Sequence, residues 1–316
     1  MPSKQRVSII IINWNGLDDT IECLKSLSNI IYTNYRISVI DNGSTGNDAD
    51  ILEENFGDSI HVIRNDKNYG FTGACNRGIR QAEKDGADYV LLLNNDTVVA
   101  PDFLTEMVKV AESNSRIGIT GGKIYSYGTD RIQFVWGGMD YWLGQHVYTP
   151  RLVTEQISKG PLDKGQYNSV RDVDWTTGCC MLIKMKVIQD IGALDGSYFS
   201  YYDDVEFCAR ARKNGYRAVY APMAKIWHKG GQSSGIVSDF VVYHGTRNRF
   251  WFMQKYSSKW QYCCFNAYFF GLYIWFAVAY YLLICRKPKL LDAFIRGIRD
   301  GLPGNRQDQV NPLSGY

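Results

Sequence analysis

The stretch that decides the fold covers residues 7–41 and reads VSIIIINWNGLDDTIECLKSLSNIIYTNYRISVID. It begins with a β-branched run at residues 7–12 and ends with a second run at residues 37–40. Such runs are typical of strands that are covered on both faces. Between them, four leucines and isoleucines recur at helical spacing, which indicates an amphipathic helix: Leu17, Ile21, Leu24 and Leu27. The stretch therefore predicts a βαβ unit with two parallel strands.

The same alternation continues along the first half of the chain. Apolar runs at residues 60–63, 89–93 and 117–120 predict further strands. Helical patterns cover roughly residues 72–85 and 102–113. This order predicts an α/β fold, with a mostly parallel sheet and flanking helices. In such sheets ligands bind beyond the carboxyl ends of the strands.

Polar residues follow three of the predicted strands. They are Asn13-Trp14-Asn15, Asp41-Asn42-Gly43-Ser44 and Asn94-Asn95-Asp96. The carboxyl ends of parallel strands lie along one edge of a sheet, so we expect these three segments to converge on one crevice.

Composition excludes some classes of protein. The chain has 316 residues, 45% of them hydrophobic, which is enough for a substantial core. Its net charge of +3 is spread without a basic block, so no nucleic-acid partner is expected. The eight cysteines include no CxxC pair, which favours reduced thiols facing the cytosol over a disulfide framework.

Two of the predicted segments have the chemistry to hold a nucleotide. Asp41 is placed to accept hydrogen bonds from a base or a ribose, although an Asx-turn or a helix cap explains it equally well. Residues 68–78 read NYGFTGACNRG and precede a helix, where backbone amides receive phosphate groups readily. This loop matches neither the P-loop pattern nor a GxGxxG after the first strand.

Acidic side chains in two places suggest reaction chemistry. Asp96, at a strand end, is a candidate ligand for a hard cation that also binds a diphosphate, or else it caps the following turn. In residues 195–216, Asp203 is predicted to be the N-cap of a helix and Gly215 its C′ residue. Asp203, Asp204 and Glu206 either complement the helix dipole or supply a general base, since four aromatic residues before them favour a raised pKa.

These features occur in an order that resembles family 2 glycosyltransferases, especially their rhamnosyltransferase-like branch. The resemblance covers about residues 5–235. It rests on Asn13 to Asn15, Asp41 to Ser44, Asn68 to Gly78, Leu92 to Thr97, Gly178, Tyr202 to Glu206, and Trp227 to Gly231.

The resemblance implies a GT-A fold, in which a Rossmann-like nucleotide-binding half with a mixed, mostly parallel sheet is fused to an acceptor-binding half in one domain. It also implies an inverting, metal-dependent transfer of a hexosyl or deoxyhexosyl group from a nucleotide sugar. Asp204 would be the catalytic base, and Asp96 and His228 would hold Mg²⁺ or Mn²⁺. The donor-binding residues would be Asn15, Asp41, Asn68, Gly70, Asn76 and Asn95. The acceptor-side residues would be Trp175, Gly178, Tyr202 and Glu206.

Two positions depart from the family pattern. Asn94 replaces the first aspartate of the motif written DxD, which puts metal affinity and metal choice in question. Asp203 stands where glutamate is commoner, so the choice of base lies between Asp203 and Asp204, and we favour Asp204.

The C-terminal fifth has a different character. Residues 262–285 carry no charge and would span about 36 Å as a helix, enough for a hydrocarbon core of about 30 Å. We expect a catalytic domain at residues 1–235, an interfacial linker at 236–260, a transmembrane helix at 261–286 and a basic amphipathic tail at 287–316. Many tyrosines favour the alternative of an interfacial helix.

Membrane attachment bears on location and acceptor. Basic residues flank the apolar segment on both sides, so a single-pass and a monotopic arrangement both remain open. Nucleotide sugars are cytosolic, which places the catalytic domain on the cytoplasmic side of the cell membrane. A lipid-linked saccharide is then the expected acceptor.

Two other functions compete with this interpretation. A nucleotidyltransferase that makes sugar nucleotides should carry a cationic Gly-rich loop after the first strand, whereas residues 13–18 contain no cation. A catalytically inactive, membrane-tethered saccharide-binding protein should lack the base, whereas Asp204 is present. The donor sugar is not specified by any motif, and UDP-, dTDP- and GDP-linked donors all remain open.

Overall fold

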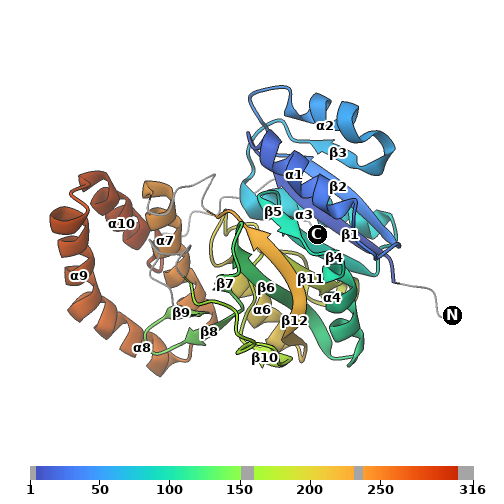
Figure 1. Ribbon diagram of the computed structural model, residues 1–316. Helices are drawn as coiled ribbons and strands as arrows, with labels where there is room; N and C mark the ends of the chain where they lie inside the picture. The colour runs from blue at the N-terminus through green and yellow to red at the C-terminus, as the bar shows by residue number, and fades with distance from the viewer. Residues whose placement is uncertain (1–4, 151–159, 231–237, 305–316) are drawn as a thin grey trace.

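The computed structural model describes residues 5–150, 160–230 and 238–304, built around one ten-stranded sheet (Figure 1). Eight of its strands follow the order β10-β12-β6-β11-β4-β1-β2-β3, with β5 added to β12 and β7 to β6. The strands are β1 Val7–Asn13, β2 Tyr35–Asp41, β3 His61–Arg64, β4 Tyr89–Asn94, β5 Thr97–Val99, β6 Ile117–Ser126, β7 Ile132–Phe134, β10 Arg171–Val173, β11 Cys180–Lys184 and β12 Arg217–His228.

The strands predicted from the opening stretch are confirmed as the parallel part of the sheet. β1 pairs in parallel with both β2 and β4, and β2 pairs in parallel with β3. Ile9, Ile10 and Ile11 are buried because helices cover both faces of β1. In this register Asn13 lies beside Asp41 and Ile12 beside Asn94, so the polar strand ends share one edge.

The remaining strands make the sheet mixed. β11 is antiparallel to both of its neighbours, β4 and β6, while β6 and β12 are parallel to each other. A separate two-stranded sheet, β8 Trp136–Asp140 with β9 Gln145–Thr149, forms a hairpin beside the main sheet. The main sheet is thus mixed but mostly parallel, with flanking helices, and the predicted fold class is confirmed.

In the part of the chain described before residue 231, six α-helices flank the sheet. They are α1 Leu17–Leu27, α2 Asp48–Phe56, α3 Gly70–Lys84, α4 Phe103–Glu112, α5 Met185–Ile191 and α6 Asp203–Lys213. α3 lies very close to β1, since a Cβ at Gly78 would be 2.6 Å from Ile10 Cγ2.

The start of α6 differs from the prediction. The N-cap is Tyr202, in a left-handed conformation with φ of 66°, and Asp203 is the first helical residue. Asp203 is buried and makes no side-chain cap, so its identification as the N-cap is wrong. The other end is confirmed, because Gly215 follows the helix with φ of +84°.

The C-terminal part consists of helices on one side of the sheet domain (Figure 1). Residues 239–256, within the segment expected to be a linker, form α7 Asp239–Tyr256. A continuous helix Lys259–Ile284 follows, made of α8 Lys259–Tyr268, α9 Ile274–Ala279 and two π-helical turns, η3 Phe269–Tyr273 and η4 Tyr280–Ile284. It is long and apolar enough to cross a membrane, by length and composition. α10 Pro288–Gly301 packs back against α7.

Candidate active site

The carboxyl ends of β1 and β2 carry a network of short polar side chains. Asp41 Oδ1 accepts hydrogen bonds from Asn13 Nδ2 at 3.0 Å and from Ser44 Oγ at 2.6 Å. Asn15 has φ of 52°, and its Oδ1 accepts a hydrogen bond from the Thr45 amide at 2.9 Å. Asn13 and Ser44 hold Asp41 in place, and no motif had marked them individually, although both lie in the predicted strand ends.

The loop before α3 is fixed by asparagines. Asn68 Oδ1 accepts hydrogen bonds from Asn42 Nδ2 at 2.9 Å and from the Gly70 amide at 2.8 Å. Gly70 requires glycine because its φ is +73° and a Cβ would lie 2.5 Å from the carbonyl oxygen of Phe199. The loop therefore joins the end of β2 to the segment that precedes α6.

Two of the expected donor-binding asparagines are used within the protein. Asn76 is buried, and its amide both donates to the Leu194 carbonyl at 2.8 Å and accepts from the Leu194 amide at 3.0 Å. Asn95 Nδ2 donates to Thr20 Oγ1 at 3.0 Å, which ties the end of β4 to α1. Asn76 thus holds α3 against the 191–195 segment, and both ends of its amide are paired inside the protein.

Asp96 and His228 come together from positions far apart in the sequence. The register between β5 and β12 places His228 beside Thr97, and Asp96 Oδ1 lies 3.1 Å from His228 Nε2. The other ring nitrogen, Nδ1, lies 3.1 Å from Gln133 Oε1, which orients the imidazole. Burial raises the pKa of Asp96, but the contact with His228 and the amide of Gly230 lower it more, so the carboxyl stays below its ordinary pKa.

This pair fits a divalent cation as a partial ligand set. Among the described residues there is no group of three or more His, Cys, Asp or Glu side chains arranged to hold a metal. One carboxylate and one imidazole nevertheless match the ligands that Mn²⁺ accepts, and diphosphate oxygens and water complete such spheres. With 3.1 Å between Asp96 Oδ1 and His228 Nε2, these two atoms are close enough that both would contact one bound cation.

Asp204 stands at the start of α6, facing the beginning of β11. Its Oδ2 accepts a hydrogen bond from the Gly178 amide at 3.2 Å, and its Oδ1 accepts one from the Val205 amide at 2.8 Å. Burial raises the pKa of Asp204, partly offset by these amides and by a hydrogen bond from Thr177. The side chain is half-buried, so one part of it faces solvent.

Asp203 has the opposite environment. It is 5% exposed, and burial together with the charge of Asp204 raises the pKa of its carboxyl well above the ordinary value. Burial raises the pKa of the Cys75 thiol on α3, and the nearby carboxyl of Asp203 raises it further. Asp203 thus points into the core between α3 and α6, while Asp204 points toward Gly178.

The two acidic segments meet at the start of β11. The Asn94 amide donates to the Cys179 carbonyl at 2.9 Å, and Gly178, one residue earlier, holds Asp204. The pKa of the Cys179 thiol is raised mainly by burial and also by the charges of both Asp96 and Asp204. Asp96 and Asp204 therefore both lie near the start of β11.

Aromatic rings form a wall next to Asp204. Trp175 and Tyr202 are buried, and His146 of β9 packs edge-on against both rings. Tyr148 packs on Trp175 at 5.2 Å between ring centroids and remains 44% exposed. Desolvation and the nearby charge of Asp204 raise the pKa of Tyr148. The exposed ring near Asp204 is thus Tyr148, which the sequence did not indicate because residues 121–178 contain little recognisable pattern.

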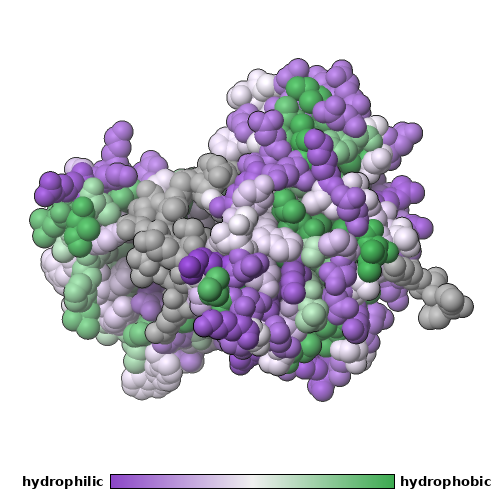
Figure 2. Space-filling model, viewed as in Figure 1, coloured by the Kyte–Doolittle hydropathy of each residue, from purple (hydrophilic) through white to green (hydrophobic). Residues whose placement is uncertain are grey.

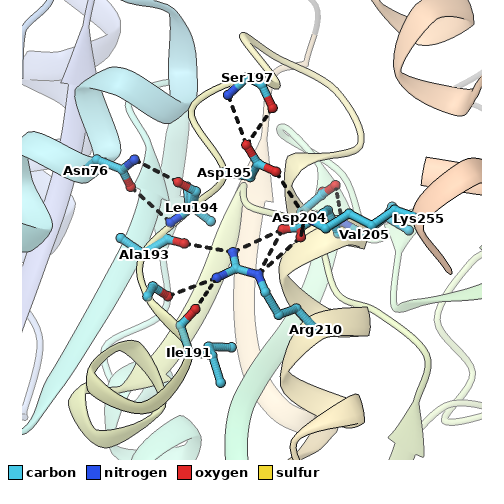
Figure 3. A network of polar contacts seen from close by, with 12 residues as sticks. Asn76, Ile191, Ala193, Leu194, Asp195, Ser197, Asp204, Val205, Arg210 and Lys255 are labelled. Atoms are coloured by element: carbon cyan, nitrogen blue, oxygen red, sulfur yellow. Dashed lines mark hydrogen bonds and ion pairs between the residues drawn. The ribbon is translucent and has the colours of Figure 1, made fainter. Parts of the chain in front are cut away.

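Glu206, expected on the acceptor side, lies instead in a closed ionic network. It is fully buried, and its carboxylate contacts Arg210 at 3.0 Å and Lys255 of α7 at 2.8 Å and accepts from the hydroxyl of Tyr256 at 2.5 Å. Arg210 in turn donates to the carbonyls of Ile191 and Ala193, at the centre of the network in Figure 3. Every contact of Glu206 is thus internal, and the network ties α6 to α7.

Removing the Glu206 carboxylate is expected to destabilise this junction. In Glu206→Ala, the part-buried Arg210 loses its carboxylate partner, and breaking a buried pair costs about 3–5 kcal/mol; we expect the lower end, about 3 kcal/mol, because Lys255 regains solvation. Urea unfolding of the two purified proteins measures this difference. The matched control is Asp50→Ala, which breaks the exposed pair with Arg64 and should cost about 1 kcal/mol or less. Equal losses of unfolding free energy in the two variants would contradict the conclusion that the Glu206 network stabilises the junction between α6 and α7.

Comparison with protein families identifies the class to which this site belongs. Residues 8–192 match the model for glycosyl transferase family 2, which is more than half of the chain. The chain belongs to glycosyltransferase family 2, as the sequence motifs had indicated.

Curated relatives agree with this class. The chain is 27% identical over 246 residues to the low-salt glycan biosynthesis hexosyltransferase Agl10 of Haloferax volcanii, covering 77% of this chain and 74% of the relative. It is 26% identical over 233 residues to an N-acetylglucosaminyl-diphospho-decaprenol L-rhamnosyltransferase of Mycobacterium tuberculosis, covering 67% and 72%. It also spans 26% of the length of y4gI, an uncharacterized protein of Sinorhizobium fredii, at 30% identity over 74% of this chain.

Solved structures confirm the GT-A fold. The crystal structure of GalNAc-T7 with UDP, GalNAc and Mn²⁺ superposes with a TM-score of 0.61 at 14% identity, covering 88% of this chain and 58% of that one. At this identity the likeness shows the fold alone, and the roles of individual residues depend on the geometry described above.

Proposed function

We propose that this chain is an inverting glycosyltransferase that moves a sugar from a nucleotide-sugar donor to a lipid-linked glycan by single displacement. The observation that carries the proposal is the convergence of the Asp96–His228 pair and Asp204 at the start of β11. Asp96 and His228 then lie on the donor side, where the diphosphate binds, and Asp204 lies on the acceptor side, where the hydroxyl enters. In this proposal, residues 1–235 form the domain that binds the donor and carries out the transfer.

The donor side is formed by the carboxyl ends of β1, β2 and β4. Asn15 and Asp41 line the nucleoside pocket, and Asn68 and Gly70 shape the loop that lies against the donor. Asp96 and His228 are the residues that would hold Mg²⁺ or Mn²⁺. When bound, the cation would neutralise the charge that develops on the departing diphosphate.

The acceptor side is organised by Asp204. Its carboxylate takes the proton of the acceptor hydroxyl while that oxygen bonds to the anomeric carbon, and the bond from this carbon to the diphosphate breaks. The Gly178 and Val205 amides fix the orientation of Asp204, and Asp203 is too buried to contact an acceptor. Trp175 packs against the exposed ring of Tyr148, and Tyr202 packs against His146, which also contacts Tyr148. The ring of Tyr148 is a face on which a sugar can stack.

The lipid-linked acceptor is supported by two independent features. The helix Lys259–Ile284 has the length and composition of a membrane segment. The mycobacterial relative is named for a sugar on a decaprenyl diphosphate carrier. A polyprenyl- or dolichyl-linked saccharide is located where such a helix holds the enzyme, on the cytoplasmic side of the cell membrane.

A panel of nucleotide sugars tests the proposal. The full-length protein in detergent micelles is incubated with UDP-, dTDP- and GDP-linked sugars, and release of the nucleoside diphosphate is measured with and without a polyprenyl diphosphate-linked acceptor. We expect turnover with one donor class, and at least a tenfold higher rate with the lipid-linked acceptor than with the same sugar free in water.

The same assay separates the competing functions. A nucleotidyltransferase would instead form pyrophosphate from a nucleoside triphosphate and a sugar phosphate. A saccharide-binding protein without activity would bind glycans but release no nucleoside diphosphate from any donor. Either result would overturn the proposed transfer reaction, whereas equal rates with free and lipid-linked sugars would remove only the lipid-linked acceptor.

A further inference from the structure

The long C-terminal helix is covered on one side only. Phe265, Phe269 and Ala277 are buried, while large apolar side chains on the other side are exposed. Figure 2 shows this hydrophobic surface at the edge of the molecule formed by α9 in Figure 1. From residue 270 to residue 284, the exposed large apolar residues are Phe270, Leu272, Trp275, Phe276, Leu282, Leu283 and Ile284. A face of this kind is unstable in water and requires an apolar partner.

The chain reverses direction directly after this helix. Arg286 adopts a left-handed conformation with φ of 54°, and α10 then runs back between α9 and α7 (Figure 1). The ring of Phe294 packs against Phe269 and Tyr281 of the long helix, with centroids 5.9 and 5.7 Å apart. The helix and α10 therefore form a hairpin.

The far end of the hairpin is fixed to α7. Gln254 Nε2 donates to the Gly301 carbonyl at 2.7 Å, and Trp251 Nε1 donates to the Asp300 carbonyl at 3.2 Å. Gly301 permits this approach, since a Cβ there would lie 3.0 Å from the Arg247 carbonyl oxygen.

α7 is in turn attached to the catalytic domain. Asn248 Nδ2 donates to the carbonyls of Ser200 and Tyr201 at 2.8 and 2.7 Å, directly before Asp203 and Asp204. Arg249 donates to the carbonyls of Leu143 and Gly144 in the turn between β8 and β9. Both ends of the hairpin are therefore held on the side of the active site.

The charges of the hairpin do not suit a bilayer core. Residues 259–301 contain six cations and two carboxylates, and five of these charged residues lie on α10. Arg286, Lys287 and Lys289 are exposed at the reversal, next to the exposed Leu282 to Ile284. If the long helix crossed the bilayer, α10 would bring its charges into the hydrocarbon beside it, which is strongly unfavourable.

We infer that residues 259–301 form a helical hairpin that lies in the plane of the membrane surface, on the catalytic side, and does not span the bilayer. The apolar face of Lys259–Ile284 enters the boundary between headgroups and acyl chains, and Arg286, Lys287 and Lys289 contact anionic headgroups. Apolar residues on one face beside a cluster of cations are the features of interfacial helices. This inference concerns attachment and does not depend on the proposed reaction.

Cysteine labelling tests the topology. Cys263, Cys264 and Cys285 are replaced by serine in the full chain, which leaves only buried cysteines among the described residues. Single cysteines are then introduced as Lys287→Cys at the reversal and Lys164→Cys on the catalytic domain, and a membrane-impermeant maleimide is applied to intact spheroplasts and to inverted vesicles.

We expect both positions to react in inverted vesicles and neither in intact spheroplasts. Reaction of Lys287→Cys from outside the cell, with Lys164→Cys protected, would show a transmembrane helix and overturn the inference. Protection of Lys287→Cys from both sides until detergent is added would place the reversal in the hydrocarbon core and overturn it as well.

Flotation with lipid vesicles tests the partner. Each basic residue near an anionic surface contributes about fivefold in binding, so Arg286→Gln/Lys287→Gln/Lys289→Gln should weaken binding to phosphatidylglycerol-containing vesicles by about 100-fold. The matched control is Lys25→Gln/Lys84→Gln/Lys164→Gln, which removes three exposed lysines of the catalytic domain and should change binding less than tenfold.

Equal losses in the two triple variants would overturn the role of the cations at the reversal. A wild-type protein that binds no vesicles but forms a dimer, and dissociates on Trp275→Glu, would show that a second copy of the chain covers the apolar face instead.

Discussion

Asp204→Asn is expected to lower kcat for sugar transfer by about 10²- to 10⁴-fold, the usual contribution of a general base. Asparagine has nearly the same shape as aspartate but does not accept the proton of the attacking hydroxyl. Donor affinity should change little, because Asp204 makes its hydrogen bonds to the Gly178 and Val205 amides and to none of the groups proposed to bind the donor. Single-turnover transfer from a radiolabelled nucleotide sugar measures the chemical step, and calorimetry measures donor binding.

Asp203→Asn provides the matched control. Burial and the neighbouring Asp204 raise the pKa of Asp203, which favours its neutral form, and asparagine is a close mimic of a neutral acid. We expect kcat within a few-fold of wild type, and a free energy of unfolding that is not lower at neutral pH. Near-normal turnover in Asp204→Asn, or an equal loss in Asp203→Asn, would remove Asp204 from the role of base.

The same assignment predicts the direction of the pH dependence. Asp204 acts only when it is deprotonated, and burial raises its pKa above the ordinary value of about 3.9 for an aspartate. Activity should therefore fall as the pH is lowered through this raised pKa, beginning at a higher pH than for an exposed aspartate. The acidic limb of kcat/KM measures it, and this limb should disappear in the residual activity of Asp204→Asn.

The part of the fold that was predictable from the sequence is the part governed by local pattern. The β-branched runs at residues 7–12 and 37–40 became adjacent parallel strands, because a strand covered on both faces must be apolar throughout. The polar residues at the ends of these strands then share one edge of the sheet. Family motifs added the pairing of Asp96 with His228, which lie 3.1 Å apart although the sequence separates them widely.

The rest depends on tertiary contacts that leave no local signature. β8 contains two glycines, and β9 carries His146 and Tyr148. Their positions are set by packing on Trp175, against which Gly137 lies without room for a Cβ. Asp203 has the sequence of an N-cap, but Tyr202 takes the cap position because its ring packs against His146 and Phe252. From the sequence alone, Glu206 resembles an acceptor-side residue. In the structure it contacts Lys255 and Tyr256, which lie about fifty residues later in the chain and bury its carboxylate.

Asp96→Ala is expected to abolish the cation-dependent part of donor binding. The loss should exceed the about 10- to 100-fold caused by removing a residue that only orients a ligand, because Asp96 is the carboxylate of the proposed site. Calorimetric titration of the nucleotide sugar in Mn²⁺ and in EDTA isolates this component. Asp102→Ala, which removes an exposed carboxylate at the start of α4, is the control and should bind the donor as wild type does.

A gain-of-function variant makes the test of Asp96 sharper. Asn94 Nδ2 lies 3.5 Å from His228 Nε2, so a carboxylate at position 94 would face the same space as Asp96. Asn94→Asp should therefore lower the Mn²⁺ concentration needed for half-maximal donor binding, because a second carboxylate adds an anionic oxygen ligand. The proposed cation site would be contradicted if Asp96→Ala kept its cation-dependent donor affinity and Asn94→Asp did not change the Mn²⁺ concentration needed for half-maximal donor binding. Asp96 would then serve only to accept the hydrogen bond of the Gly230 amide at 3.2 Å, and the diphosphate would be held elsewhere.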